Sequence, residues 1–585
     1  MKKIINAPEA VVDEMCLGLA LAHNGVENLA KYRIIKRKAI NPGKVSLISG
    51  GGSGHEPPHA GFVGTGMLDA AVCGDVFASP SQIQIYQAIK AAASPKGTLL
   101  IIKNYSGDVM NFQAAAFLAE TDGIKVDHIK VADDIAVKDS LYTVGRRGVA
   151  GTVLVHKIAG AAAEAGLDLP EVKRIAQKAA DRVRSLGFAL TSCTVPAKGS
   201  PTFALAEDEM EYGVGIHGEP GIHREKTASA DQLAARMTAA LLEDLKAGPG
   251  SRVALLVNGF GATPLQELYI LAQAAVRELS ERDISAFRLF VGNYMTSIDM
   301  AGASISIMDL DAELEKYLAA KCCAPAFKID GSETPVAYAR PGKDGVPHGQ
   351  PAIDADSSGG GNVIAGNRLS LKNVIFLVDK MAEIIIRNEM PFCELDSHAG
   401  DGDFGMSVAK GFRQLKREWK SVLAGHSADI GEFLDACSLI IMEHCGGASG
   451  PIWGIAFKYA AKLAAGKGEL SIQDAAAMLQ AAVDGIQAIG EKAFGRGAVV
   501  GDKTLVDALA PCADAWRDCA KRGDDLKAAF AKGAEAAAAG AKSTEKIAAR
   551  LGRAGALGDR SIGYPDAGAH ALGVICAEIA KALED

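Results

Sequence analysis

The sequence predicts an α/β N-terminal half followed by an all-α C-terminal half. Three observations lead to this prediction. The first third of the chain alternates β-rich runs with alanine-rich runs, residues from about 340 to 366 are rich in Gly, Pro, Ser and Asp, and the segments beyond carry apolar residues at helical spacing. With 585 residues the chain exceeds the size of a single hydrophobic core, so several folding units are expected.

The first third is expected to form a mostly parallel sheet, because its β-rich runs alternate with helical stretches. A second set of the same βαβ character follows, with a helix expected at 265–281. The expected strands are 44–49, 98–103 and 124–131 in the first set, and 252–258 and 285–291 in the second.

The region from about 340 to 366 is expected to be a linker, because it contains too little apolar surface to offset the entropy of ordering it. Beyond it, alanine is abundant and β-branched runs are almost absent, which favours helices. Segments with helical spacing of apolar residues are 374–388, 471–489 and 528–541. The remainder of the chain is therefore predicted to be all-α.

Charge and composition exclude several classes of function. Lys and Arg total 62 against 70 Asp and Glu, a formal net charge of -8, which gives no sign of a surface for nucleic acid or anionic lipid. No run approaches the ~20 apolar residues that cross a bilayer, and Asp13 and Glu14 before the first apolar run do not fit a secretory signal. The 11 cysteines include no CxxC pair, which argues against a zinc site or a disulfide framework and favours a reducing cytoplasm. A small-molecule partner is expected.

Two polar clusters follow expected strands of the first set. A glycine-rich run at 50–57 contains His55, and a second strand ends at Lys103 and is followed by Asp108. Because parallel strands end at the same edge of a sheet, His55 and Asp108 could share one cleft as base and acid. From the residues alone, the glycines fit a tight turn as well as a ligand loop, and Asp108 fits a turn or capping residue.

A third candidate is His217, which lies between glycines in a loop where no apolar face is expected to enclose it. A neutral imidazole can add to a ketone carbonyl, so this residue could hold a small hydroxyketone covalently and ignore a polyol such as glycerol. A surface loop histidine is the alternative.

The predicted helical half contains an acidic turn with Asp396, Asp401 and Asp403 separated by glycines. Three carboxylates on a short turn suit Mg²⁺ and hence nucleotide phosphates, although a solvated acidic turn is also compatible. The run at 445–451 fits a glycine-rich helix start that binds phosphate, or an ordinary turn between helices. The run at 495–504 has the wrong spacing for a Walker A loop.

Seven motifs lie in the order and spacing of the dihydroxyacetone kinase family, and the chain resembles that family over nearly its whole length. The motifs are GGGSGHEP, KNYSGD, GIHGEPG, LDSHAGDGDFG, GGASGP, GDKTLVDAL and GRAGALGDRSIGYPDAG. The resemblance implies a DhaK-like half at 1–335 with two α/β subdomains at about 1–190 and 191–335, a flexible linker at 336–366, and a DhaL-like helical barrel at 367–585.

The resemblance also implies an activity and a set of roles. The activity is ATP-dependent phosphorylation of a small hydroxyketone, first of all dihydroxyacetone and also glyceraldehyde, by a cytoplasmic homodimer that uses ATP and Mg²⁺. His217 would form a hemiaminal with the substrate carbonyl, and His55 and Asp108 would activate the attacking hydroxyl. The substrate would be oriented by Gly52, Ser53, Gly54 and Lys103. The metal would be held by Asp396, Asp401 and Asp403. The nucleotide would be lined by Gly405, Ser407, Gly447, Ala448, Ser449, Gly450 and Arg553.

The chain departs from the family pattern in two places. His398, Ala399 and Phe404 stand where the family commonly has a Gln-Ile pair and a His, and Ala448 stands where Thr or Ser is common. The three carboxylates are intact, so these departures are expected to affect nucleotide affinity and substrate range. The rival hypotheses are a kinase of a four-carbon ketose such as erythrulose, an FAD-cyclising activity of the nucleotide half, a relay in which bound ADP is recharged by a phosphotransferase protein, and a ketone-binding or regulatory protein without catalysis.

Overall fold

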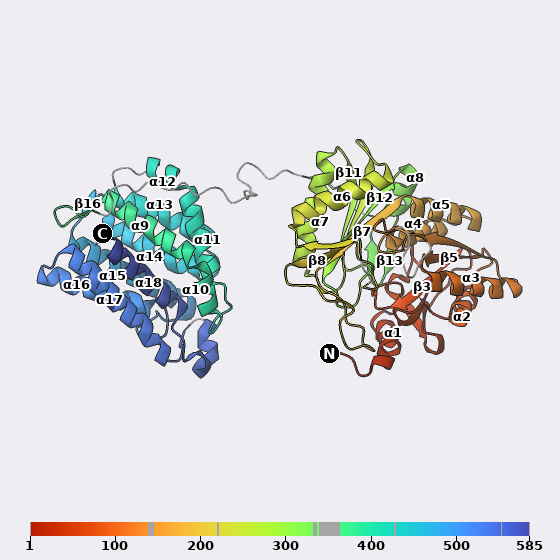
Figure 1. Cartoon of the computed structure of the whole chain (residues 1–585), viewed down its shortest axis with the longest axis horizontal. Coiled ribbons are helices and arrows are strands. Elements are labelled where there is room, and N and C mark those ends of the chain that lie inside the picture. Colours follow the sequence, from red (N-terminus) through yellow and green to blue (C-terminus); the bar gives the residue numbers. More distant parts are fainter. Residues whose placement is uncertain are drawn as a thin grey trace. The chain divides into compact units, whose positions relative to one another are not determined.

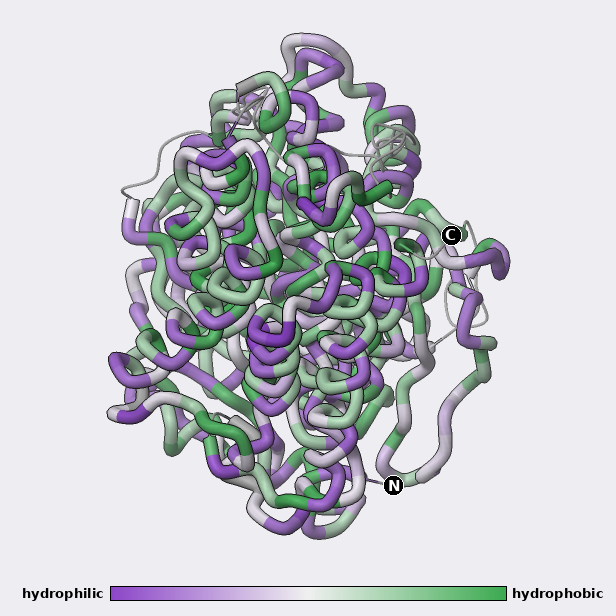
Figure 2. Tube along the Cα trace, turned by 90° about the vertical axis from the view of Figure 1, so that its left-hand side faces the viewer, coloured by the Kyte–Doolittle hydropathy of each residue, from purple (hydrophilic) through white to green (hydrophobic). Residues whose placement is uncertain are grey.

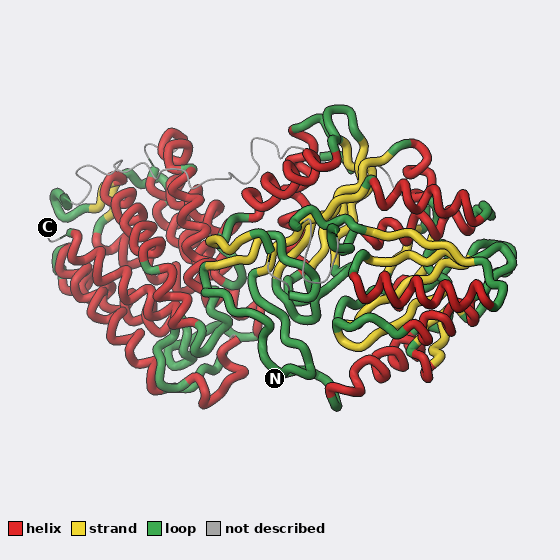
Figure 3. The backbone as a smooth tube through the Cα atoms, turned by 45° about the vertical axis from the view of Figure 1, so that its right-hand side comes forward, coloured by secondary structure: helices red, strands yellow, loops and turns green. Residues whose placement is uncertain are grey.

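The computed structural model describes residues 2–137, 145–218, 221–331, 336–338, 363–425, 429–551 and 553–583. The chain divides into two compact units, Met1–Asp344 and Gly345–Asp585 (Figure 1). The described residues of the first unit form two six-stranded sheets with helices, and those of the second are almost entirely helical (Figure 3). The predicted fold class is confirmed. Most of the predicted linker at 336–366 lies outside the described residues.

The first sheet has the strand order β1-β2-β4-β3-β5-β6. Its four strands from β4 to β6 run parallel, as predicted, and β2 and β1 add an antiparallel edge. Alternate residues point to opposite faces: Leu47 packs in the core that contains α1, α4 and α5, and Ile48 packs against α2 and α3. The elements are β1 (Val26–Leu29), β2 (Ile34–Arg37), β3 (Ser46–Ser53), β4 (Ala70–Val76), β5 (Thr98–Lys103), β6 (Val126–Val131), α1 (Val11–Ala22), α2 (Gln82–Ala92), α3 (Ser106–Thr121), α4 (Thr152–Glu164) and α5 (Leu169–Asp181).

The glycine-rich run was expected to follow the strand at 44–49, and the structure places part of it inside β3. Gly50 and Gly52 do not follow the strand but lie inside it, because β3 continues to Ser53. A Cβ on Gly50 would lie 2.5 Å from the Val72 carbonyl oxygen, and a Cβ on Gly52 would lie 2.7 Å from the Ala78 amide nitrogen. The glycines therefore allow β4 and the segment after it to approach the strand closely.

The second sheet has the order β11-β10-β12-β7-β8-β9. Only β10 and β11, joined through α7, pair in parallel, so the predicted βαβ unit is present, but the sheet as a whole is mainly antiparallel. The elements are β7 (Val183–Ala189), β8 (Glu209–Tyr212), β9 (His223–Lys226), α6 (Ala230–Leu245), β10 (Arg252–Gly259), α7 (Leu265–Glu281), β11 (Ser285–Gly292), β12 (Gly302–Leu310), α8 (Ala312–Ala319), β13 (Cys322–Ala324) and β14 (Phe327–Ile329).

The two sheets share one hydrophobic core. One face of the second sheet packs on α6 and α7, and residues of its other face, including Leu256 and Met308, join the core that holds α4 and Leu47. Strand β7, which precedes the predicted subdomain boundary at about 190, pairs with β12 of the second sheet. An isolated antiparallel bridge between Thr65 and Cys323 also joins β13 to the first subdomain.

The described part of the second unit forms a closed ring of helices. Neighbours around the ring are α9, α11, α13, α14, α15, α16, α17 and α18, and α18 packs back on α9. Helix starts are encoded locally, since Ser370 and Ser471 form capping boxes at α9 and α15. The helices are α9 (Leu371–Arg387), α10 (Glu389–Asp396), α11 (Phe404–Arg417), α12 (Trp419–Gly425), α13 (Ile430–His444), α14 (Ser449–Ala464), α15 (Ile472–Phe494), α16 (Val506–Arg522), α17 (Leu526–Ser543) and α18 (Ala567–Ala582), with the 3₁₀ segment η5 (Arg553–Ser561) before α18.

The ring encloses an apolar cavity of about 260 Å³, lined by residues such as Trp453, Phe457, Trp516 and Phe530. Along the helices of Figure 2, hydrophobic and hydrophilic residues alternate every few positions, as amphipathic helices require. Among the described residues, no helix combines the length and the apolar character that crossing a bilayer requires.

Candidate functional site

His55 follows β3 and is held from the second subdomain. Its side chain is 1% exposed, and its Nδ1 lies 2.9 Å from the Thr296 carbonyl oxygen. Because a carbonyl oxygen only accepts, Nδ1 carries the hydrogen, and in the neutral ring Nε2 keeps its lone pair. Burial, together with the positive charge of Lys103, holds the pKa of His55 well below its ordinary value. His55 is therefore a neutral imidazole whose Nε2 carries an available lone pair.

His217 lies directly opposite that nitrogen. The distance between the two Nε2 atoms is 3.0 Å, so the hydrogen between them belongs to His217. The ring is partly buried, and it meets Phe77 and Tyr105 edge to face with centroid separations of 5.1 and 4.7 Å. The expectation that no apolar face would enclose His217 was wrong, because aromatic residues from two other segments surround it.

Lys103 and Asp108 meet beside these histidines. Both are almost fully buried, and a Cβ on Gly51 would lie 3.2 Å from Lys103 Nζ and 3.4 Å from Asp108 Oδ2. Asp108 is in the first turn of α3 rather than in a loop. Burial raises the pKa of its carboxyl, against the opposing effects of the Lys103 charge and a hydrogen bond from Ser79. A carboxylate with a raised pKa is a stronger base than an ordinary aspartate.

Ser79 and Phe77 also belong to this cluster, although they were not predicted from the sequence. The Ser79 hydroxyl donates to Asp108 Oδ1 at 2.5 Å, and the Phe77 ring stacks on His55 with a centroid separation of 5.1 Å. Both follow β4, whose carboxyl end lies at the same sheet edge as those of β3 and β5. The strand-end argument that found His55 and Lys103 would have found them if the run at 70–76 had been recognised as a strand.

The remaining residues predicted to orient the substrate lie at the end of β3. The Ser53 hydroxyl donates to the Gly74 carbonyl oxygen at 2.8 Å, and the Gly54 amide donates to the Glu56 carboxylate at 3.0 Å. Gly52 is buried next to them. These groups hold the backbone between β3 and His55, and their contact with substrate stays a prediction.

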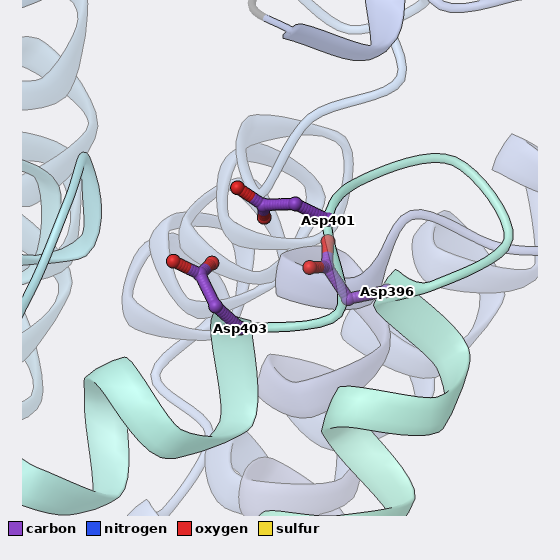
Figure 4. Close-up of side chains that lie close together, drawn as sticks. All are labelled: Asp396, Asp401 and Asp403. Carbon is purple, nitrogen blue, oxygen red and sulfur yellow. The ribbon is translucent and has the colours of Figure 1, made fainter. Parts of the chain in front are cut away.

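The predicted metal ligands converge in the second unit. Carboxylate oxygens of Asp396, Asp401 and Asp403 lie within 4.8 Å of one another, between the end of α10 and the start of α11 (Figure 4). Asp396 Oδ2 accepts a hydrogen bond from the Gly402 amide at 2.9 Å, which closes the turn. Three hard oxygen ligands at this separation fit a magnesium ion.

Two helix starts lie next to this turn. Gly405 and Ser407 are in the first turn of α11, and the loop before α14 reaches them, since the Gly446 amide is 3.4 Å from the Ser407 carbonyl oxygen. Helix α14 begins at Ser449, with Ala448 as its N-cap, Gly450 in its first turn, and Gly447 just before it with a φ of 54°. First-turn amides attract phosphate, which suits the predicted nucleotide contacts. Arg553 opens η5, but its side chain lies outside the described residues.

Asp566 was also missed in the sequence. It caps α18 by accepting a hydrogen bond from the Ala569 amide at 2.8 Å. Burial raises its pKa to about 7, and the charges of Asp507 and Asp396 add to this effect. The acidic cluster of the second unit therefore extends beyond the single turn that the sequence indicated.

Two family models match the chain, the Dak1 domain over residues 17–326 and the DAK2 domain over residues 398–581. Over 314 residues the chain is 54% identical to the PTS-dependent dihydroxyacetone kinase 1, dihydroxyacetone-binding subunit DhaK, of Listeria innocua, a match that covers 54% of this chain and 95% of the relative. It is 34% identical over 590 residues to the D-erythrulose kinase of Mycolicibacterium smegmatis, covering 100% of this chain and 99% of that one.

A solved structure matches as well. The dihydroxyacetone kinase from C. freundii in complex with AMP-PNP and Mg²⁺ is 32% identical, with a TM-score of 0.59 and 99% of each chain covered. Matches of this length and identity, over both halves, establish the family. The chain belongs to the dihydroxyacetone kinase family, in the arrangement that fuses a DhaK-like and a DhaL-like half.

Proposed function

We propose that this protein transfers the γ-phosphoryl group of ATP to a terminal hydroxyl of a small hydroxyketone, with dihydroxyacetone as the principal substrate. The observation that carries the proposal is the contact between His55 Nε2 and His217 Nε2 at 3.0 Å, beside the buried Lys103 and Asp108. A buried base facing a second imidazole suits covalent capture of a carbonyl compound. The cluster of three aspartates in the second unit suits a metal-bound nucleotide.

Capture of the ketone needs one proton transfer. A ring nitrogen that carries hydrogen has no free lone pair, so His217 Nε2 gives its proton to His55 Nε2 as it attacks the carbonyl carbon. A C–N bond forms, the carbonyl π bond breaks, and His55 passes the proton to the resulting oxygen. The product is a neutral hemiaminal, and His55 returns to its starting state. The Thr296 carbonyl keeps His55 in the tautomer that this step requires.

Phosphoryl transfer follows from the held substrate. The terminal hydroxyl oxygen attacks the γ-phosphorus, an O–P bond forms, and the P–O bond to ADP breaks. Asp108 accepts the hydroxyl proton, and the Lys103 ammonium offsets the negative charge that develops on the oxygen. Asp396, Asp401 and Asp403 would hold magnesium, which when bound neutralises phosphate charge. The start of α14, at Ser449, would donate amides to the phosphates.

The substrate could also be a four-carbon ketose, since such a molecule offers the same hydroxyketone end to His217. The match to the D-erythrulose kinase of M. smegmatis supports this alternative. A comparison of kcat/KM for dihydroxyacetone, glyceraldehyde and both erythrulose enantiomers decides between them. We expect dihydroxyacetone to give the highest value, and a preference for glycerol over all of these would contradict covalent capture.

A second candidate function concerns the phosphoryl donor. The match to the PTS-dependent subunit of L. innocua favours a relay in which bound ADP is recharged by a phosphoprotein. The test is purified protein with MgATP and dihydroxyacetone in the absence of any other protein. Continuous formation of product in proportion to ATP consumed supports the ATP-dependent kinase. Product limited to one equivalent per chain would support the relay, and no product with any hydroxyketone would support a binding or regulatory protein.

A further inference from the structure

Lys503 occupies an unusual position between α15 and α16. Its side chain is 2% exposed, and its backbone has a φ of 61°, in the left-handed region. It belongs to the run at 495–504, where Asp502 separates the lysine from Gly501 and the spacing is not that of a phosphate loop. The proposed function gives this residue no role.

The Lys503 ammonium points at backbone carbonyl oxygens. The partners and their distances from Nζ are Thr544 O at 2.7 Å, Ser561 O at 2.7 Å, Tyr564 O at 2.7 Å and Ile547 O at 3.2 Å. An ammonium has three hydrogens, so these four acceptors leave none for a phosphate. Lys503 is therefore not a nucleotide ligand.

All four carbonyls belong to one stretch, residues 544–564, which joins α17 to α18 and contains η5. We call it the α17–α18 connection. Carbonyl dipoles aimed at a single point repel one another unless a cation lies between them, and the buried ammonium provides that cation. Burial lowers the pKa of the Lys503 ammonium, and the nearby carboxylates of Asp566, Glu545 and Asp507 act in the opposite direction and favour its charged form. The connection thus folds around a positive charge that the chain itself supplies.

The connection also reaches the aspartate turn. The Tyr564 ring stacks on the His398 ring with a centroid separation of 3.8 Å and an interplanar angle of 9°. His398 lies between Asp396 and Asp401 in the sequence. Lys503 therefore fixes the backbone of Tyr564, and the side chain of Tyr564 contacts the metal-binding turn.

We propose that Lys503 is a positioning residue, an internal cation that shapes the α17–α18 connection and, through the stack of Tyr564 on His398, holds the aspartate turn ready for a magnesium nucleotide. The proposal rests on the proposed function only in taking a magnesium nucleotide as the ligand. It can therefore be tested by binding alone, without turnover of any ketone.

The first test measures Mg-ADP binding to the full chain by isothermal titration calorimetry. Lys503→Met keeps most of the length of the side chain and removes its charge, and we expect the Kd to rise at least tenfold. Lys521→Met, which changes an exposed lysine on the neighbouring α16, serves as the matched control and should bind as the wild type does. Circular dichroism and thermal melting check that each variant is folded.

Chemical rescue separates positioning from general destabilisation. Lys503→Ala leaves space among the carbonyls, so ethylammonium should restore most of the lost affinity, whereas tetramethylammonium, which has no N–H, should not. A folded Lys503→Met that binds Mg-ADP as tightly as the wild type would overturn the proposal. So would a folded Lys503→Ala that ethylammonium does not restore.

The stack provides a second, milder test that leaves the carbonyl cluster intact. Tyr564→Phe keeps the ring and should bind Mg-ADP as the wild type does, while Tyr564→Ala should weaken binding several-fold. Equal affinities for these two variants would overturn the link through His398. If no hydroxyketone is phosphorylated but these shifts in Kd occur, the positioning role stands and the proposed function falls. A wild-type chain that binds no Mg-ADP would overturn both.

Discussion

The proposed ketone site and the proposed metal site are built in opposite ways. His55, Lys103 and the α3 residue Asp108 are almost fully buried, whereas Asp401 is exposed and Asp396 and Asp403 are only partly covered. The difference follows from the chemistry proposed for each. Capture of a carbonyl needs imidazole nitrogens with fixed hydrogen positions, which buried hydrogen bonds provide, while a hydrated magnesium triphosphate needs accessible carboxylates and amides. The proposed chemistry of the first site therefore depends on burial, and that of the second depends on charge.

The largest effect should come from the charge-dependent site. Asp401→Ala removes one of three metal ligands, and we expect kcat/KM for MgATP to fall by more than about a thousandfold. Steady-state kinetics and calorimetry with Mg-ADP measure this loss, and dihydroxyacetone binding should not change. Asp514→Ala, which removes an exposed carboxylate of α16, is the control. Comparable losses for both variants would mean that overall acidity, and not the cluster, matters.

The next effect should come from the nucleophile of the buried site. His217→Ala is expected to raise the KM for dihydroxyacetone by roughly a hundredfold or more, because the ketone is no longer held covalently. The measurement is initial rate against ketone concentration, with mass spectrometry of the ketone adduct as a second readout. His223→Ala, at a more exposed histidine of β9, should match the wild type. An unchanged KM in His217→Ala would refute the hemiaminal.

A smaller effect should follow from removing an aromatic ring that packs against the two histidines. Phe77→Ala removes a ring that contacts both histidines and should raise the KM for dihydroxyacetone about tenfold by letting His217 move. The added space should also shift preference toward erythrulose. The ratio of kcat/KM for the two ketones measures this shift, and an unchanged ratio would show that Phe77 does not set the size of the site.

The smallest effect should be a shift of the pH dependence of kcat. Asp108 acts as a base in its ionised form, and the hydrogen bond from Ser79 stabilises that form. In Ser79→Ala the pKa of Asp108 should rise further, so the acid limb of the kcat profile should move to higher pH by about one unit. At pH 8 the rate should fall only slightly. A limb that stays in place or moves to lower pH would exclude Asp108 as the titrating base.

Much of both sites could be predicted from local signals. Strand ends indicated His55, Lys103 and Asp108, and the spacing of acidic residues indicated Asp396, Asp401 and Asp403, because each depends on a short stretch of sequence. The strand pairings of β7 and β12 were not predicted, since they join residues more than a hundred positions apart and leave no local trace.

Several site residues were missed for the same reason. Phe77 and Ser79 lie at the site because β4 pairs with β3. The contacts of Lys503 come from a connection about 50 residues further along the chain. Asp566 caps α18, and its pKa is raised by burial and by carboxylates that lie far from it in the sequence. A residue whose chemistry is set by distant partners cannot be identified from its own surroundings in the sequence.

The acceptor that orients His55 is a main-chain oxygen, that of Thr296, and this has a consequence for how the site can vary. The loop that carries it is attached to the segment after β3 at several points, since the Thr296 amide donates to the His55 carbonyl at 3.0 Å and the Ile298 amide donates to the Gly54 carbonyl at 2.8 Å. No side-chain replacement can delete such an oxygen, so alanine scanning would overlook it. The tautomer of His55 therefore depends on the path of the chain, and the buried Thr296 side chain helps to hold that path, because its hydroxyl donates to the Glu56 carbonyl at 2.8 Å.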